Sequence, residues 1–100
     1  MTDTTKTIAE DVHARVWTVL REQFGPAASE LTDDGEFVDV LSAGFDSLTA
    51  LDTISRIEAA FGVEVDFVGH DVRHWFASPA RIVRFVADQL EDQAALRSTS

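Results

Sequence analysis

The stretch Gly44-Phe45-Asp46-Ser47-Leu48 decides how the rest of the chain is interpreted, because an amphipathic segment follows it at once. Glycine and aspartate are typical of a turn, and apolar residues at helical spacing begin directly after it. Ser47 is therefore expected at a helix N-terminus, where unpaired backbone N–H groups and the helix dipole favour an anion. A serine in that position is suited to carry a phosphate ester.

The predicted helix from about Ser47 to Phe61 has an inner face and a flanking stripe. The inner face is expected to be buried and consists of Leu51, Ile54, Ile57 and Phe61. The second stripe flanks the core, faces solvent in part and consists of Leu48, Asp52, Ser55 and Ala59. Gly62 is expected to end this helix, since glycine accepts the left-handed backbone conformation that follows many helices.

Apolar periodicity predicts three further helices. The first runs from about Lys6 to Phe24 and ends at Gly25-Pro26; its inner face consists of Ile8, Val12, Val16, Val19, Leu20 and Phe24. A short helix covers Asp71 to Phe76, with Asp71 as its cap and Trp75 or Phe76 pointing inward. The last begins at Ser78-Pro79, a strong start signal, and reaches about Ala94; its inner stripe consists of Ile82, Phe85, Val86 and Leu90.

The connection from Ala27 to Asp46 is expected to be a long loop that its own hydrophobic residues hold against the core. Its expected anchors are Phe37, Val40 and Leu41. A strand over Phe37–Leu41 is the weaker alternative, because no second strand is predicted to pair with it. The acidic run Asp33–Glu36 is interpreted as a solvated turn, since it lacks the alternating spacing of a calcium-binding loop.

These elements predict an all-α fold, a small four-helix bundle with a long first loop and a short third helix. One hundred residues fit a single domain over 1–100, with a core from about 6 to 94 and frayed termini. A chain of this length can build one core and little more, so a deep, enclosed active site is not expected.

Charge and composition exclude several classes of function. Eighteen acidic residues against eight basic ones give a net charge of −10, which disfavours nucleic-acid binding because phosphates would be repelled. The acidity suits either general solubility or attraction to basic protein partners. The absence of cysteine removes any thiol nucleophile or thiolate metal site. Without a signal peptide or membrane-spanning run, we expect a cytoplasmic monomer that does not bind membranes.

A hydrolase interpretation would pair Ser47 with His13, His70 or His74. The sequence lacks the second glycine of the G-x-S-x-G motif and the strand that precedes it. We therefore expect no catalytic residue and no enzymatic activity. His70 and His74 could share a helix face and bind a metal, but no third ligand is evident, so no metal site is predicted.

Gly44–Leu48 resembles the G-x-D-S-L signature of carrier proteins, namely acyl carrier proteins and the peptidyl carrier domains of nonribosomal synthesis. The segment Ile54-Ser55-Arg56-Ile57-Glu58-Ala59-Ala60-Phe61-Gly62-Val63-Glu64-Val65 follows the signature at the distance typical of that family. The order of the predicted helices also fits, so the resemblance covers about Ile8 to Leu90.

The resemblance implies that a phosphopantetheinyl transferase attaches the 4′-phosphopantetheine arm of coenzyme A to Ser47. The thiol of the arm would then carry an acyl or aminoacyl group as a thioester. Asp46 is implied to help the transferase place its metal and phosphate. We expect partner enzymes to contact the start and outer side of the following helix, at Leu48, Thr49, Asp52, Ser55 and Arg56.

The segment from Phe67 to Val83 is similar to stand-alone carriers that a separate adenylating enzyme loads, such as D-alanyl carrier proteins. It contains the skeleton Phe67, Asp71, Arg73, Trp75, Ser78-Pro79 and Ile82-Val83. The expected partners are a loading enzyme, either adenylating enzyme or acyltransferase, and a downstream synthase or transferase. The expected setting is natural-product (polyketide or nonribosomal peptide) synthesis of the antibiotic type.

The chain departs from fatty-acid carriers in the charge of the helix after Ser47. Thr49 and Ala59 stand where those carriers often have acids, and Arg56 adds a base, so residues 47–61 have a net charge of −1. Most acids near Ser47 lie in the preceding loop: Asp33, Asp34, Glu36, Asp39 and Asp46. Our hypothesis is that partners recognise Leu48, Asp52 and Ser55 by shape while the loop acids steer their approach.

The competing interpretation is a helical module that only binds other proteins and has no prosthetic group. The presence of Ser47 in the signature favours the carrier. The sequence leaves open whether the carried group is acyl or aminoacyl, because one scaffold serves both; we lean toward an aminoacyl or amino-acid-derived group.

Overall fold

The structure is a computed structural model that describes residues 4–98, with side chains described for 10–42 and 44–94. It contains α1 (Thr4–Phe24), α2 (Phe37–Leu41), α3 (Ser47–Phe61), α4 (Val72–Trp75) and α5 (Pro79–Ser98). Two 3₁₀ helices, η1 (Gly25–Glu30) and η2 (Ser42–Gly44), lie between α1 and α3. No strand occurs among residues 4–98, so the predicted all-α class is confirmed.

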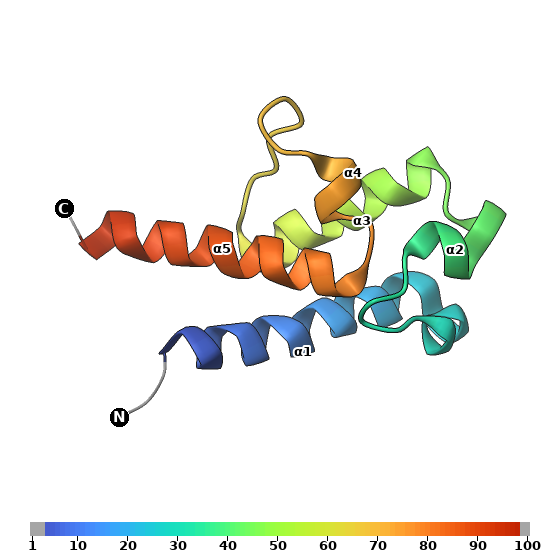
Figure 1. Cartoon of the computed structure of the whole chain (residues 1–100), viewed down its shortest axis with the longest axis horizontal. Helices are drawn as coiled ribbons and strands as arrows, with labels where there is room; N and C mark the ends of the chain where they lie inside the picture. Colours follow the sequence, from blue (N-terminus) through green and yellow to red (C-terminus); the bar gives the residue numbers. More distant parts are fainter. Residues whose placement is uncertain (1–3, 99–100) are drawn as a thin grey trace.

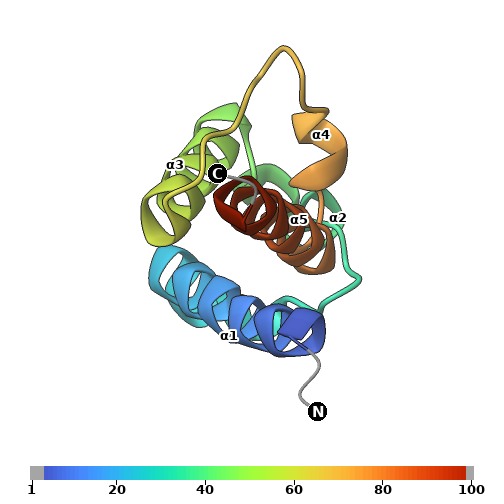
Figure 2. The ribbon, with the colours of Figure 1, turned by 90° about the vertical axis from the view of Figure 1, so that its left-hand side faces the viewer.

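Of the three long helices, α1 and α5 lie roughly along the longest axis of the molecule, and α3 is inclined to it (Figure 1). The chain runs toward the α2 end in α1, and it runs back in α3 and α5. Viewed end-on, α1, α3 and α5 surround a common centre, and α4 lies beside α5 (Figure 2). The start of α3 therefore lies at the end of the bundle opposite to the start of α1 and the end of α5.

The core between these helices comes from the predicted inner faces. Its fully buried members include Val12, Val16 and Leu20 of α1, Ile57 of α3, and Ile82 and Val86 of α5. Ile8 lies outside the residues whose side chains are described. Gly25 ends α1 with a φ of 58°, a backbone conformation that glycine adopts without strain.

The connection between α1 and α3 differs from the prediction, because it contains three short helical segments. Residues 37–41 form neither a plain loop nor a strand but the helix α2. Tertiary contacts fix it: the Phe37 N–H donates to the Ala77 carbonyl oxygen at 2.9 Å, and the Phe37 side chain is fully buried. Val40 and Leu41, the other expected anchors, pack against the core in part.

Helix α3 has the predicted bounds, and Gly62 ends it with a φ of 66°. The prediction that Leu51 is buried was wrong, since 48% of its surface is exposed. Consecutive helical residues are about 100° apart, so Leu51 is turned away from the face that Ala50 and Thr53 share. Thr53 is 1% exposed, and its hydroxyl donates to Gln23 Oε1 of α1 at 2.9 Å.

The second half of the chain follows the predicted start signals. The Asp71 carboxylate accepts from the His74 N–H at 3.3 Å and caps α4, while Phe76 is buried. Ser78 Oγ accepts from the Arg81 N–H at 3.3 Å at the start of α5.

Helix α1 begins earlier, and helix α5 ends later, than predicted. Thr4 and Thr5 belong to α1, and Arg97 and Ser98 belong to α5, because no glycine or proline interrupts these segments. Residues 1–3 and 99–100 lie outside the described residues. Among those that are described, no helix combines the length and apolar character that a membrane crossing would need.

Candidate functional site

Asp46, and not Ser47, caps the N-terminus of α3. Its Oδ1 atom accepts from the backbone N–H of Thr49 at 2.8 Å and from the Thr49 hydroxyl at 2.9 Å. The hydrogen bond from the Thr49 N–H is the main reason why the pKa of the Asp46 carboxyl is lowered below its ordinary value. Ser47 is thereby left as the first residue of the helix.

The Ser47 side chain is exposed at this helix tip. Within residues 4–98 its hydroxyl takes part in no hydrogen bond. The first-turn N–H groups and the helix dipole create a positive partial charge around it, which stabilises an anion attached to its oxygen. The site therefore presents one free hydroxyl where a phosphate ester would be favoured.

The turn before Ser47 is held by aromatic packing. The Phe45 ring stacks on the buried Phe37 ring with 5.0 Å between centroids and an angle of 18° between planes. Phe24, at the end of α1, contacts both rings at centroid distances of 6.0 and 6.4 Å. Such pairs add to the stabilisation from burial alone, so Phe45 fixes the backbone that delivers Asp46 and Ser47 to the helix tip.

The outer side of α3 is more apolar than its sequence suggests. Leu48 is 77% exposed and Leu51 is 48% exposed. The charges of Asp52 and Arg56 balance each other in an ion pair with 3.1 Å between Oδ2 and Nε. The sequence missed Leu51 as a surface residue; its signal was the place of Ala50 and Thr53 in the inner stripe.

The other predicted contact residues of α3 differ in exposure. Ser55 and Arg56 are exposed, as is Asp52. Thr49 is only partly exposed, since its hydroxyl donates to Asp46 and its carbonyl oxygen accepts from Gln23 at 3.2 Å. These bonds give Thr49 a role in holding α3 against α1.

Two of the three histidine side chains have hydrogen-bond partners elsewhere in the described chain. His13 Nε2 lies 2.9 Å from Asp33 Oδ1, which also accepts from Trp17 Nε1 at 2.8 Å. His70 lies in the turn before α4, where its Nδ1 accepts from the Asp66 N–H at 2.9 Å. His70 and His74 therefore do not share a helix. Among the described residues, no group of three possible metal ligands comes together.

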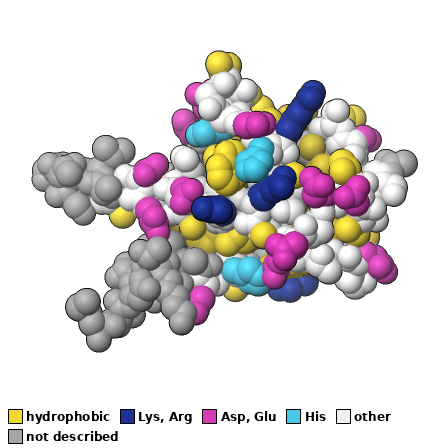
Figure 3. Space-filling model, viewed as in Figure 1, with side chains coloured by type: hydrophobic (Ala, Val, Ile, Leu, Met, Phe, Trp, Pro, Cys, Tyr) yellow, Lys and Arg dark blue, Asp and Glu magenta, His cyan; other side chains and the backbone are white. Residues whose placement is uncertain are grey.

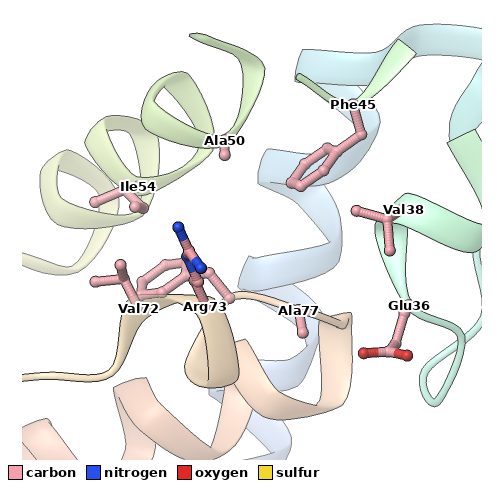
Figure 4. A pocket seen from close by; sticks show the side chains of 9 residues that line it. Glu36, Val38, Phe45, Ala50, Ile54, Val72, Arg73 and Ala77 are labelled. Carbon is pink, nitrogen blue, oxygen red and sulfur yellow. The ribbon is translucent and has the colours of Figure 1, made fainter. Parts of the chain in front are cut away.

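A cavity of about 360 Å³ opens beside the start of α3, between α2, α3 and α4 (Figure 4). Its walls are mostly apolar, and they include Val38, Phe45, Ala50, Ile54 and Phe76. Glu36 and Arg73 are the charged residues on its lining. Phe45 and Ala50 flank Ser47 in sequence, so the cavity adjoins the helix tip. The sequence did not predict it, because three separate segments build it.

Acidic side chains are scattered over the face of the molecule in Figure 3, including over α2. Among the loop acids, Asp33 is bound by His13 and Trp17, and Glu36 lies 3.7 Å from Arg81. Asp34 and Asp39 are exposed and form no ion pair in the described part of the chain.

Comparison with known proteins assigns the family. Residues 14–68, more than half of the chain, match the family described as "Phosphopantetheine attachment site". An acyl carrier protein of Thermotoga maritima is 33% identical over 57 residues, which is 57% of this chain and 68% of that protein. An acyl carrier protein of Guillardia theta is 34% identical over 56 residues, 56% of this chain and 67% of that protein. No solved structure matches the chain significantly.

The chain therefore belongs to the phosphopantetheine-attachment family of carrier proteins. Such a protein holds 4′-phosphopantetheine covalently on a serine. It is a carrier and not an enzyme, and it works together with transferase and synthase enzymes. The matched residues include Gly44–Leu48 and the whole of α3.

Proposed function

We propose that this protein is a discrete carrier that holds an acyl or aminoacyl intermediate as a thioester on an arm attached at Ser47. The observation that supports this most is the exposed hydroxyl of Ser47, free of hydrogen bonds, at the first residue of α3. It lies within the segment that matches the attachment-site family.

The proposal is also supported by the fact that Asp46, and not Ser47, caps α3. An N-cap serine would have its oxygen occupied by a backbone N–H of the first turn. Because the Asp46 carboxylate takes that role, the Ser47 oxygen is free to form a phosphodiester with the arm while the nucleotide part of coenzyme A leaves. The transferase would activate the hydroxyl, so the carrier needs no general base of its own.

Tethering explains how so small a protein can serve several enzymes. An intermediate held on a flexible arm is present at a high effective concentration for every enzyme to which the carrier docks. The arm moves and the bundle docks, so no catalytic group is required on the carrier itself.

Docking is proposed to use the outer side of α3 next to Ser47. Leu48 and Leu51 are large apolar side chains exposed on a helix whose nearby charges, Asp52 and Arg56, are paired. Recognition by shape fits such a surface better than recognition by net charge. Asp46, with Ser55, would lie at the edges of the same contact.

The expected pathway is natural-product synthesis, of the polyketide or nonribosomal peptide type. This rests on the similarity of Phe67–Val83 to stand-alone carriers that an adenylating enzyme loads. Neighbouring genes test it: an adenylating enzyme supports aminoacyl cargo, whereas a ketosynthase or acyltransferase supports acyl cargo.

The function is tested by incubating the protein with coenzyme A and a promiscuous phosphopantetheinyl transferase and measuring its intact mass. The wild type and the control Ser29→Ala, which changes an exposed serine outside α3, are expected to gain one phosphopantetheine group, and Ser47→Ala is expected to gain none. If the folded wild type gains no mass, the alternative of an interaction module without a prosthetic group is favoured.

A further inference from the structure

The cavity beside Ser47 has one basic and one acidic residue, Arg73 and Glu36, on a mostly apolar lining. Figure 4 shows the Arg73 guanidinium projecting from α4 into the cavity toward α3, next to Ile54. Among the described residues, Arg73 forms no ion pair and no side-chain hydrogen bond. Arg15, Arg56 and Arg81, by contrast, each lie within 4 Å of a carboxylate.

The acid on the opposite edge of the cavity does not balance the charge of Arg73. The Glu36 carboxylate lies 3.7 Å from the guanidinium of Arg81 in α5 and is therefore paired with that arginine instead of Arg73. Asp71, two residues before Arg73, is used to cap α4. The cavity therefore offers apolar walls and one free, planar donor group that suits a carboxylate.

The arm's own phosphate is poorly placed to reach Arg73. The phosphate would be bonded to Ser47, whereas Arg73 lies next to Ile54, seven residues further along α3. At a rise of 1.5 Å per residue this separation is about 10 Å along the helix axis. An anion that reaches Arg73 must therefore sit beyond the phosphate, toward the end of the arm that carries the cargo.

We propose that Arg73 is a specificity-determining residue that binds a carboxylate on the carried group. The cargo class is a short acyl chain with a second acidic function, whose apolar body lies against Ile54 and Phe45. A simple aminoacyl group brings an ammonium ion instead, which the free guanidinium repels. The inference rests on the proposed attachment at Ser47 and narrows its cargo.

The test compares two cargoes of equal length on the full chain. The transferase loads the protein from glutaryl-coenzyme A, whose acyl group ends in a carboxylate, or from pentanoyl-coenzyme A, whose group ends in a methyl. Intact mass first confirms loading in each case, so a failure of attachment is separated from a failure of the Arg73 proposal. The variants are Arg73→Gln and, as matched control, Arg84→Gln, which removes an exposed arginine that does not line the cavity.

The first readout is the ratio of thioester hydrolysis rates, glutaryl over pentanoyl. We expect this ratio to be about two- to fivefold lower in the wild type than in Arg73→Gln, the range that a solvent-accessible charge pair produces. Arg84→Gln should behave as the wild type. Equal ratios in the wild type and Arg73→Gln overturn the proposal.

The second readout is the NMR signal of the Arg73 Nε–H in the apo, arm-only, pentanoyl and glutaryl forms. The signal is expected to shift only in the glutaryl form. A shift that already appears between the apo and arm-only forms would assign the anion to the arm's phosphate and overturn the cargo proposal.

Discussion

At the scale of single residues, the site depends on which side chain caps α3. A serine at a helix start is usually interpreted as a cap, and the sequence alone placed Ser47 at the helix N-terminus without separating it from Asp46. The structure separates them, because Asp46 accepts the Thr49 N–H. The order of acid and serine thus leaves the hydroxyl free while keeping it in the positive field of the helix tip.

The two roles given to Asp46 can be separated by two substitutions. Asp46→Asn keeps a capping oxygen but removes the charge, so thermal stability should change little while the rate of arm transfer falls. Asp46→Ala removes both and should lower the melting temperature by several degrees as well. Calorimetry and transferase kinetics check this; an Asp46→Asn variant loaded at the wild-type rate would remove Asp46 from the transfer step.

Asp33 predicts a dependence of stability on acidity. Hydrogen bonds from Trp17 and then His13 lower the pKa of the Asp33 carboxyl from its ordinary value of 3.8. A carboxyl group whose pKa is lower in the folded state than in the unfolded state stabilises the fold at pH values above its ordinary pKa. This stabilisation is lost as the pH falls through the lower pKa of the folded state.

Asp33→Asn is therefore expected to reduce the free energy of unfolding at pH 7 by less than about 1 kcal/mol, since the carboxylate is half exposed. The difference from the wild type should shrink as the pH falls below 3.8. Urea unfolding at pH 7 and pH 3 measures both values. A difference that grows in acid would contradict the sign of this linkage.

At the scale of elements, periodicity predicted the long helices because their burial follows a regular stripe. It failed where tertiary contacts decide. Helix α2 depends on the bond from Phe37 to Ala77, forty residues away, which no local pattern reveals. Leu51 was predicted to be buried because it is hydrophobic, although its position around the helix axis turns it toward solvent. Thr53 is polar but buried, and its hydroxyl is hydrogen-bonded to Gln23.

The difference between exposed and buried apolar residues on α3 predicts that leucine and isoleucine substitutions affect docking and stability differently. Leu48→Ala and Leu51→Ala should alter stability by less than about 0.5 kcal/mol but reduce kcat/KM of a partner enzyme by about five- to tenfold, since they remove apolar docking area. Ile54→Ala, which is buried, should lower the free energy of unfolding by about 2–5 kcal/mol. A Leu51→Ala variant as unstable as Ile54→Ala would show that Leu51 belongs to the core.

At the scale of the whole molecule, the net charge could be predicted from the sequence, whereas the cavity could not. Net charge is a sum over residues and needs no fold, so the prediction against nucleic-acid partners could be made from the sequence alone. The cavity forms only when α2, α3 and α4 are placed together. The sequence therefore identified Arg73 only as one of the residues shared with stand-alone carriers, and not as part of a cavity. The prediction that the arm is attached at Ser47 lies between these cases, because it rests on one short local motif.

The steering hypothesis is now restricted to the acids that have no structural partner. Asp34→Lys with Asp39→Lys should slow loading and weaken its dependence on salt, because exposed charges attract a basic partner over long range. Asp33 is omitted from the test, since it binds His13 and Trp17. Loading rates measured at low and high salt check this, and unchanged rates in the double variant would refute steering.

The position of the arm tests the central claim most directly. After loading with coenzyme A, trypsin is expected to release residues 22–56, which contain Ser29, Ser42, Ser47 and Ser55. Fragmentation of this peptide in a mass spectrometer locates the phosphodiester. We predict that it lies on Ser47 alone; an arm found on another serine or threonine, or none on the folded protein, would contradict the assignment.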